Sequence, residues 1–95
     1  MGMRFLGSFK KTCSFEDWLK PVDSLKPQMD KHELKLIFAT ENEDGNLIYD
    51  VGEAATMEGF EAFLSDPEVR KMRIDAGVDI GSQEVISAVG KFDVF

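Results

Sequence analysis

The 95-residue sequence predicts a single domain (residues 1–95) of the α+β class, with elements in the order β-α-β-β-α-β. Three observations carry this prediction. Residues 3–9 alternate between apolar and polar side chains, residues 34–53 hold two β-rich runs around an acidic, glycine-containing stretch, and residues 56–77 hold two capped helical pieces. Each pattern is typical of one kind of element, and together they cover about half of the chain.

The alternation over residues 3–9 predicts the first strand, and the residues after it predict a helix. Ser14, followed three residues later by Asp17, forms a capping box with an acid in the usual glutamate position. The apolar residues that follow keep helical spacing, so this helix is expected to pack on the sheet. Pro21 is expected to bend the helix or interrupt its hydrogen bonds, and Pro27 to mark its end or a restart.

Residues 56–77 predict a kinked helix whose start, restart and end are each marked by a capping residue. Thr56 can accept hydrogen bonds from the first free backbone N–H groups. Asp66 followed by Pro67 restarts the helix with a capping carboxylate and a proline at the first helical position. Gly77 supplies the left-handed residue that ends the helix.

The strands complete the architecture. Residues 34–40 and 46–53 predict a hairpin, and residues 84–95 predict a last strand that runs to the C-terminus. The complete order gives a ferredoxin-like sandwich, in which a four-stranded antiparallel sheet carries both helices on one face.

The open face of this sheet is expected to form a homodimer. Leu36 and Ile37 are neighbours on one strand, so apolar side chains point to both faces although the chain covers only one. A second copy related by a two-fold axis would cover the other face. The C-terminal Phe92, Val94 and Phe95 are too apolar for a free tail and are expected to cross onto the partner.

The run FEAFLSDPEVRKMRIDAGV, together with SFEDW at the first helix and the hairpin between them, resembles the dimeric α/β-barrel superfamily. In particular, it is similar to uncharacterised members related to antibiotic-biosynthesis monooxygenases, over about residues 5–89. The resemblance implies a dimeric α/β barrel. Members of this superfamily include cofactor-independent oxygenases, haem-degrading enzymes, isomerases and proteins with no established activity, so the fold says little about chemistry.

Two departures from the family bear on function. Many such relatives have a histidine late in the first helix, and residues 23–25 here are Asp-Ser-Leu. Trp18 and His32 lie in the wrong elements for a haem-degrading site. We therefore expect no cofactor.

Composition excludes several partners and sites. The formal net charge of −7 opposes binding to nucleic acid or to an anionic membrane surface. The single cysteine cannot form an internal disulfide, and no signal peptide or membrane span is expected, so the predicted location is cytoplasmic. The acidic stretch at residues 41–45 does not have the spacing of a calcium loop, and no metal site is expected.

Three residues are candidates for catalysis: His32, Tyr49 and Asp50. Imidazole is well matched to neutral pH, but His32 has charged neighbours and is expected in an exposed turn. Asp50 lies within an apolar strand, either on the solvent face or functionally placed, and the solvent face is favoured. Cys13 lies just before a helix N-terminus and is expected to be an incidental thiol.

Aromatic residues suggest a ligand pocket. Trp18, Phe15, Phe60 and Phe63 could line an apolar cavity between helices and sheet, with Tyr49 and Asp50 at its mouth, although ordinary core packing is the favoured interpretation. Two functions remain open. The favoured one is a non-catalytic homodimer that binds a small hydrophobic ligand or acts as an accessory subunit. The alternative is a cofactor-independent monooxygenase-like enzyme for an aromatic or polyketide-like substrate, which lacks a convincing base.

Overall fold

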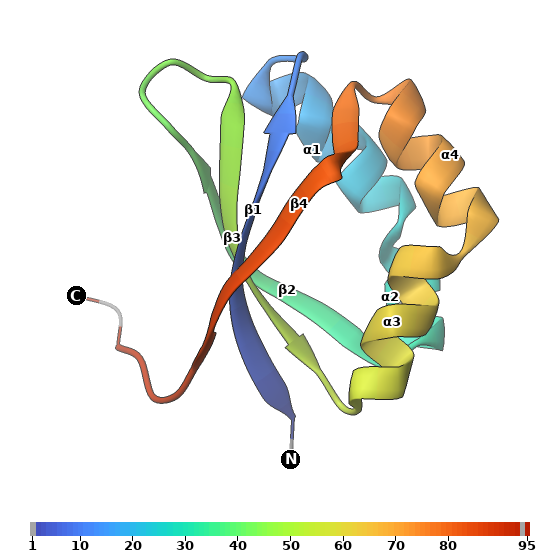
Figure 1. Cartoon of the computed structure of the whole chain (residues 1–95), viewed down its shortest axis with the longest axis vertical. Helices are drawn as coiled ribbons and strands as arrows, with labels where there is room; N and C mark the ends of the chain where they lie inside the picture. The colour runs from blue at the N-terminus through green and yellow to red at the C-terminus, as the bar shows by residue number, and fades with distance from the viewer. Residues whose placement is uncertain (1, 94) are drawn as a thin grey trace.

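The computed structural model describes residues 2–93 and 95 and shows a four-stranded antiparallel sheet with its helices on one face (Figure 1). The strand order is β2-β3-β1-β4, which is the ferredoxin-like arrangement that the sequence predicts. Each predicted helix is divided in two, so the full order is β-α-α-β-β-α-α-β. The elements are β1 (Met3–Lys11), α1 (Phe15–Ser24), α2 (Lys26–Lys31), β2 (Leu34–Glu41), β3 (Leu47–Ala54), α3 (Met57–Ser65), α4 (Pro67–Asp75) and β4 (Val78–Val89).

Side-chain caps fix three of the helix starts, as the sequence predicts. Each capping oxygen accepts a hydrogen bond from a backbone N–H group that the helix itself leaves free. The pairs are Ser14 with Asp17 N–H (3.1 Å), Thr56 with Gly59 N–H (3.0 Å) and Asp66 with Glu68 N–H (2.9 Å). Gly77 follows α4 with φ +96°, a left-handed conformation that glycine adopts without strain.

The break in the first helical segment lies at Leu25 rather than at Pro21. Pro21 is inside α1, which continues to Ser24, and Leu25 keeps helical hydrogen bonds to the carbonyls behind it. Its side chain is only 5% exposed, so burial in the core holds the junction between α1 and α2. Pro27 lies in the first turn of α2, where a missing N–H group costs little, and the predicted restart is confirmed.

The prediction for the last strand is wrong at both ends. β4 begins at Val78, directly after the glycine that stops α4, and it ends at Val89 instead of continuing to the C-terminus. The start could not be recognised from an alternating pattern, because the polar residues 81–83 (Gly-Ser-Gln) interrupt it. In the structure β4 forms a bulge at these residues, where it pairs with β1. Residues 90–93 and 95 lie outside the sheet, and the predicted position of Val94 lies outside the described residues.

The two faces of the sheet differ in what covers them. The buried cluster Phe9, Trp18, Ile48 and Val78 joins the inner face to the helices. On the open face, Phe38 remains 59% exposed, opposite Val51 of the neighbouring strand. No helix within residues 2–93 and 95 is long and apolar enough to cross a membrane.

Candidate functional site

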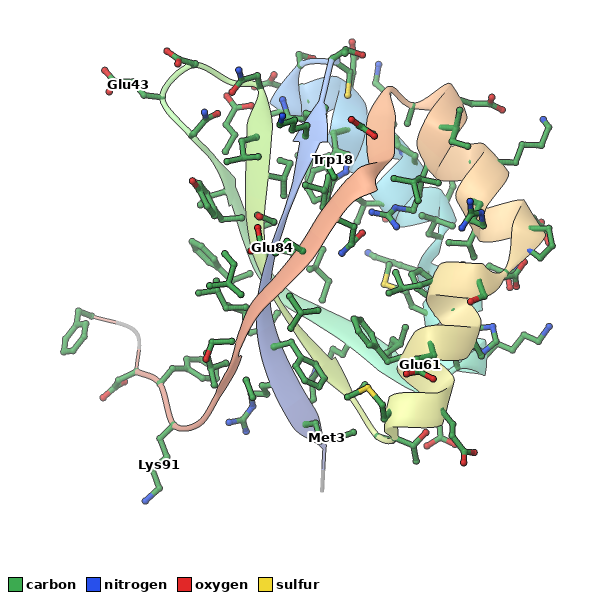
Figure 2. All side chains as sticks on the ribbon, viewed as in Figure 1. Met3, Trp18, Glu43, Glu61, Glu84 and Lys91 are labelled. Carbon is green, nitrogen blue, oxygen red and sulfur yellow. The ribbon has the colours of Figure 1, made fainter. Side chains whose placement is uncertain are left out.

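A cavity of about 130 Å³ lies between the inner face of the sheet and the helical layer. Figure 2 shows Trp18 between these two layers. Phe5 and Phe60 stack with their ring centroids 5.2 Å apart, and Trp18 packs 5.9 Å from Phe9. Trp18, Phe60 and Phe63 line the cavity, as the sequence analysis proposed for a ligand pocket, whereas Phe15 is not in the lining and packs on Trp18 with ring centroids 5.7 Å apart. Most of the cavity wall is therefore apolar and aromatic.

Tyr49 and Asp50 do not share the mouth of this cavity. Consecutive strand residues point to opposite faces. Asp50 pairs with Gly7 and lines the cavity, whereas Tyr49 lies on the open face, 37% exposed. The expectation that Asp50 faces solvent is wrong, and so is the placement of Tyr49 at the cavity mouth.

Asp50 belongs to a polar group inside the apolar cavity, together with Arg73 from α4 and Gln83 from β4. Arg73 is 8% exposed and its guanidinium donates a hydrogen bond to the Oε1 atom of Gln83. The same guanidinium lies 5.1 Å from the centre of the Phe9 ring, a cation–π distance. Gln83 and the aromatic ring thus hold the cation in the cavity wall.

Burial and mutual attraction shift the pKa values of Asp50 and Arg73 in opposing senses. Burial raises the pKa of Asp50 above its usual value, and the positive charge of Arg73 opposes part of that rise. Burial also lowers the pKa of Arg73, partly offset by the negative charge of Asp50. Among the described residues, no hydrogen bond to the Asp50 carboxylate is found. The carboxylate is therefore a free acceptor that can take a hydrogen bond or a proton from a bound molecule.

Gly7 makes room for this carboxylate. A Cβ atom at position 7 would lie 3.2 Å from the Oδ1 atom of Asp50 and 3.1 Å from the backbone oxygen of Glu84. Both distances are tighter than ordinary van der Waals contacts. A side chain at position 7 would therefore displace Asp50 or the β4 backbone.

Arg73 and Gln83 are functional candidates that the sequence reasoning missed. Arg73 lies four residues after Val69, which is fully buried, so helical spacing places both on the inner side of α4. That spacing was the available signal. Gln83 gives no signal of its own, because a bulge of β4 turns it toward Arg73.

His32 lies away from the cavity lining and is not in an exposed turn. Its side chain is 17% exposed, its Nε2 atom is 3.6 Å from the Oδ2 atom of Asp66, and its ring meets Phe63 edge-on at 6.2 Å. The expectation of an exposed histidine is wrong because the turn after α2 packs against the junction of α3 and α4. His32 therefore contacts the back of the cavity wall through Phe63 and does not reach Asp50.

Cys13 is partly buried against the core cluster, and its thiol is free. Its backbone oxygen accepts a hydrogen bond from the Nζ atom of Lys11 at 2.7 Å. Lys11 is 3% exposed and also donates to Glu41 Oε1 (2.9 Å) and to the oxygen of Gly45 (2.7 Å). This buried lysine ties the acidic hairpin to the start of α1, a structural role that the sequence analysis did not predict.

A solved structure from Chloroflexus aurantiacus J-10-fl, provisionally named an antibiotic biosynthesis monooxygenase, is similar over 100% of both chains. The two chains share this fold. The TM-score is 0.53 and the sequence identity is 13%, a level at which the likeness shows the fold alone. The resemblance inferred from the sequence is thereby confirmed at the level of architecture. No protein-family model matches the chain, and no curated protein matches it.

Proposed function

We propose that the chain binds one small, mainly apolar molecule in the cavity between sheet and helices. The observation that carries this proposal is an aromatic-walled cavity of about 130 Å³ with a charged, hydrogen-bonding end at Asp50 and Arg73. A dry protein cavity of roughly this size accepts a benzene ring. The fitting ligand is therefore about one aromatic ring in size.

The polar end of the cavity selects the ligand further. Asp50 offers a carboxylate without a hydrogen-bond partner among the described residues, so it favours a ligand with a hydroxyl donor. A hydrogen bond from a hydroxyl group to a buried carboxylate is charge-assisted and stronger than a neutral one. Phenol carries both required features, a single ring and a donor.

Calorimetric titration of the wild-type protein with phenol and with toluene tests the proposal. We expect phenol to bind about tenfold more tightly than toluene, because only phenol can donate to Asp50. Asp50→Ala should remove this preference, and Asp44→Ala, which changes a carboxylate on the exposed hairpin turn, should keep it. Wild-type protein that binds neither ring, and carries no small molecule in native mass spectrometry, would contradict the proposal.

The position of Asp50 favours a second candidate function, that of a cofactor-independent monooxygenase-like enzyme for an aromatic or polyketide-like substrate. In its first step the O–H bond of a phenolic substrate breaks, the proton passes to Asp50 and the electron pair stays on oxygen. Arg73 would stabilise the resulting anion. Oxygen consumption with a panel of hydroquinones tests this function, and Asp50→Asn should lower turnover by about 100-fold. Equal turnover of this variant would contradict a base at Asp50.

We further propose that the chain forms a homodimer through the open sheet face. Leu6, Phe38 and Val51 lie in one row across three strands of that face, and Ser8, Thr40 and Tyr49 form the next row. Apolar side chains of this size gain free energy when a partner covers them. A second copy covers them symmetrically, because an isologous contact uses the same patch on both chains.

A further inference from the structure

We infer that Gly52, in the middle of β3, sets the volume of the cavity and thereby the size of the ring that it accepts. This inference rests on the proposed ligand site. Gly52 lines the cavity and lies directly opposite Phe5 in the sheet.

The backbone at position 52 does not require glycine. Among the described residues, the glycines with positive φ are Gly45 and Gly77. Glycine within a strand weakens that strand, because it gains no packing and loses more conformational freedom on folding. A side chain at position 52 would thus be favourable unless something occupies its space.

Nothing in the described chain occupies that space. Within 4 Å of a Cβ atom built at position 52, the contact found is the backbone oxygen of Lys35 at 3.7 Å, which is an ordinary distance. In many sheets an aromatic residue on the neighbouring strand covers a glycine. Here the Phe5 ring stacks on Phe60 instead, and no Phe5 atom comes within 4 Å of that Cβ position. The space above Gly52 is therefore part of the cavity.

Gly7 and Gly52 have different tasks on the cavity floor. A Cβ atom at position 7 would crowd the Asp50 carboxylate at 3.2 Å, whereas a Cβ atom at position 52 would crowd no described atom. Glycine at position 7 leaves room for the Asp50 carboxylate. Glycine at position 52 leaves room for the ligand, and a methyl group there would occupy space that part of the ligand ring needs.

Gly52→Ala and Gly52→Val, titrated with phenol by calorimetry, test the inference. We expect the alanine variant to bind phenol about tenfold more weakly and the valine variant to show no binding, since alanine overfills the pocket by one carbon and valine by three, and a single surplus carbon already has an effect of about tenfold or more. Gly81→Ala is the matched control. It changes an exposed glycine of β4, where the nearest described atom is Asp79 Oδ1 at 3.5 Å, and should leave phenol affinity unchanged.

Xenon uptake, measured by xenon NMR on the same variants, separates the inference from the proposed function. Xenon enters dry apolar cavities whatever their biological ligand. Uptake by the wild type and its loss in Gly52→Val support the inference even if phenol binds to none of the variants, a result that would count against the proposed ligand alone. Equal xenon uptake by folded wild type and Gly52→Val, or measurable phenol binding that is equally tight in the two, would overturn the inference.

Discussion

Alternate residues of β3 lie on opposite faces of the sheet and have different surroundings. Asp50 and Gly52 face the helices and form the floor of the cavity, whereas Tyr49 and Val51 face away from them. One step along the chain thus separates a partly buried carboxylate in the cavity lining from an exposed aromatic ring. A residue's place in the strand alternation therefore decides its surroundings here more than its chemical type does.

The two faces also differ in the surroundings of their charged side chains. On the inner face, Asp50 and Arg73 are held in apolar surroundings, where burial shifts both pKa values toward the neutral forms. On the open face, Arg4 and Glu53 form an ion pair at 3.4 Å with side chains about one-third exposed. Such an exposed pair contributes little to stability. The inner face therefore holds the charged pair on which the proposed ligand site rests, and the open face is the one proposed for the dimer.

The largest expected effect is on stability, and it comes from removing the Trp18 ring, which packs from α1 against the inner face of the sheet. This side chain is 5% exposed and contacts the rings of Phe9 and Phe15. Trp18→Ala should lower the free energy of unfolding by about 3–5 kcal/mol, because a large cavity replaces the indole. Leu19→Ala, at a neighbouring position that is 43% exposed, is the control and should cost much less. Urea unfolding followed by circular dichroism measures both, and equal losses would show that Trp18 is not a core residue.

The next effect comes from breaking the open face at Phe38. Replacing this 59% exposed ring by lysine should raise the dimer dissociation constant at least about 30-fold, the scale of an interface hot spot. Ile74→Lys changes a side chain of similar exposure on α4, in the helical layer, and should leave dimerisation unchanged. Analytical ultracentrifugation measures both variants. A wild type that stays monomeric at micromolar concentration would refute the proposed interface.

A smaller effect is expected on the pH dependence of the unfolding free energy, through Asp50 on the inner face. Because the pKa of Asp50 is raised, the folded state holds its proton more tightly than the unfolded state, so this group destabilises the fold progressively as pH rises above 3.8. The unfolding free energy of Asp50→Asn minus that of the wild type should therefore increase from acid to neutral pH.

Asp17 supplies the control of opposite sign. A hydrogen bond and the positive charge of Lys20 lower the pKa of Asp17, so this group stabilises the fold above its usual pKa and loses that contribution in acid. The same difference for Asp17→Asn should decrease from acid to neutral pH. Urea unfolding across this pH range measures both, and trends of the same sign would refute the assignment for Asp50.

The smallest effect is expected from the C-terminal segment. Arg4 holds this segment through a hydrogen bond to the oxygen of Gly90 at 3.0 Å and a position 5.4 Å from the centre of the Phe92 ring. Figure 2 shows Lys91 on the side away from the helical layer. Deleting residues 91–95 should weaken the dimer a few-fold, as measured by ultracentrifugation. An unchanged dissociation constant would show that the tail does not reach the partner.

Local signals predicted the helix starts well, and long-range pairing decided the rest. Ser14, Thr56 and Asp66 cap helices through bonds to residues two or three positions away, so their roles could be inferred from sequence. The face of Asp50 could not be inferred, because apolar residues flank it at both odd and even positions and the register with β1 decides which set is buried.

The bulge in β4 marks a second limit of the sequence reasoning. It pairs Ser8 with Glu84 but Lys10 with Asp79, so the strand takes up extra residues that no alternating pattern reveals. This irregularity turns Gln83 toward Arg73 and also hides the start of the strand. The contribution of Gln83 to the candidate site therefore could not be predicted from the sequence, whereas the aromatic walls could.

The division of tasks between the two faces can be tested most directly by methyl NMR of the wild-type protein during a phenol titration. Leu36 and Ala54 carry methyl groups in the cavity lining, and Leu6 and Val51 carry them on the open face. This division predicts that the methyl signals of Leu36 and Ala54 shift with phenol concentration while those of Leu6 and Val51 stay in place. Shifts confined to Leu6 and Val51, or no shift at any of the four residues, would contradict it.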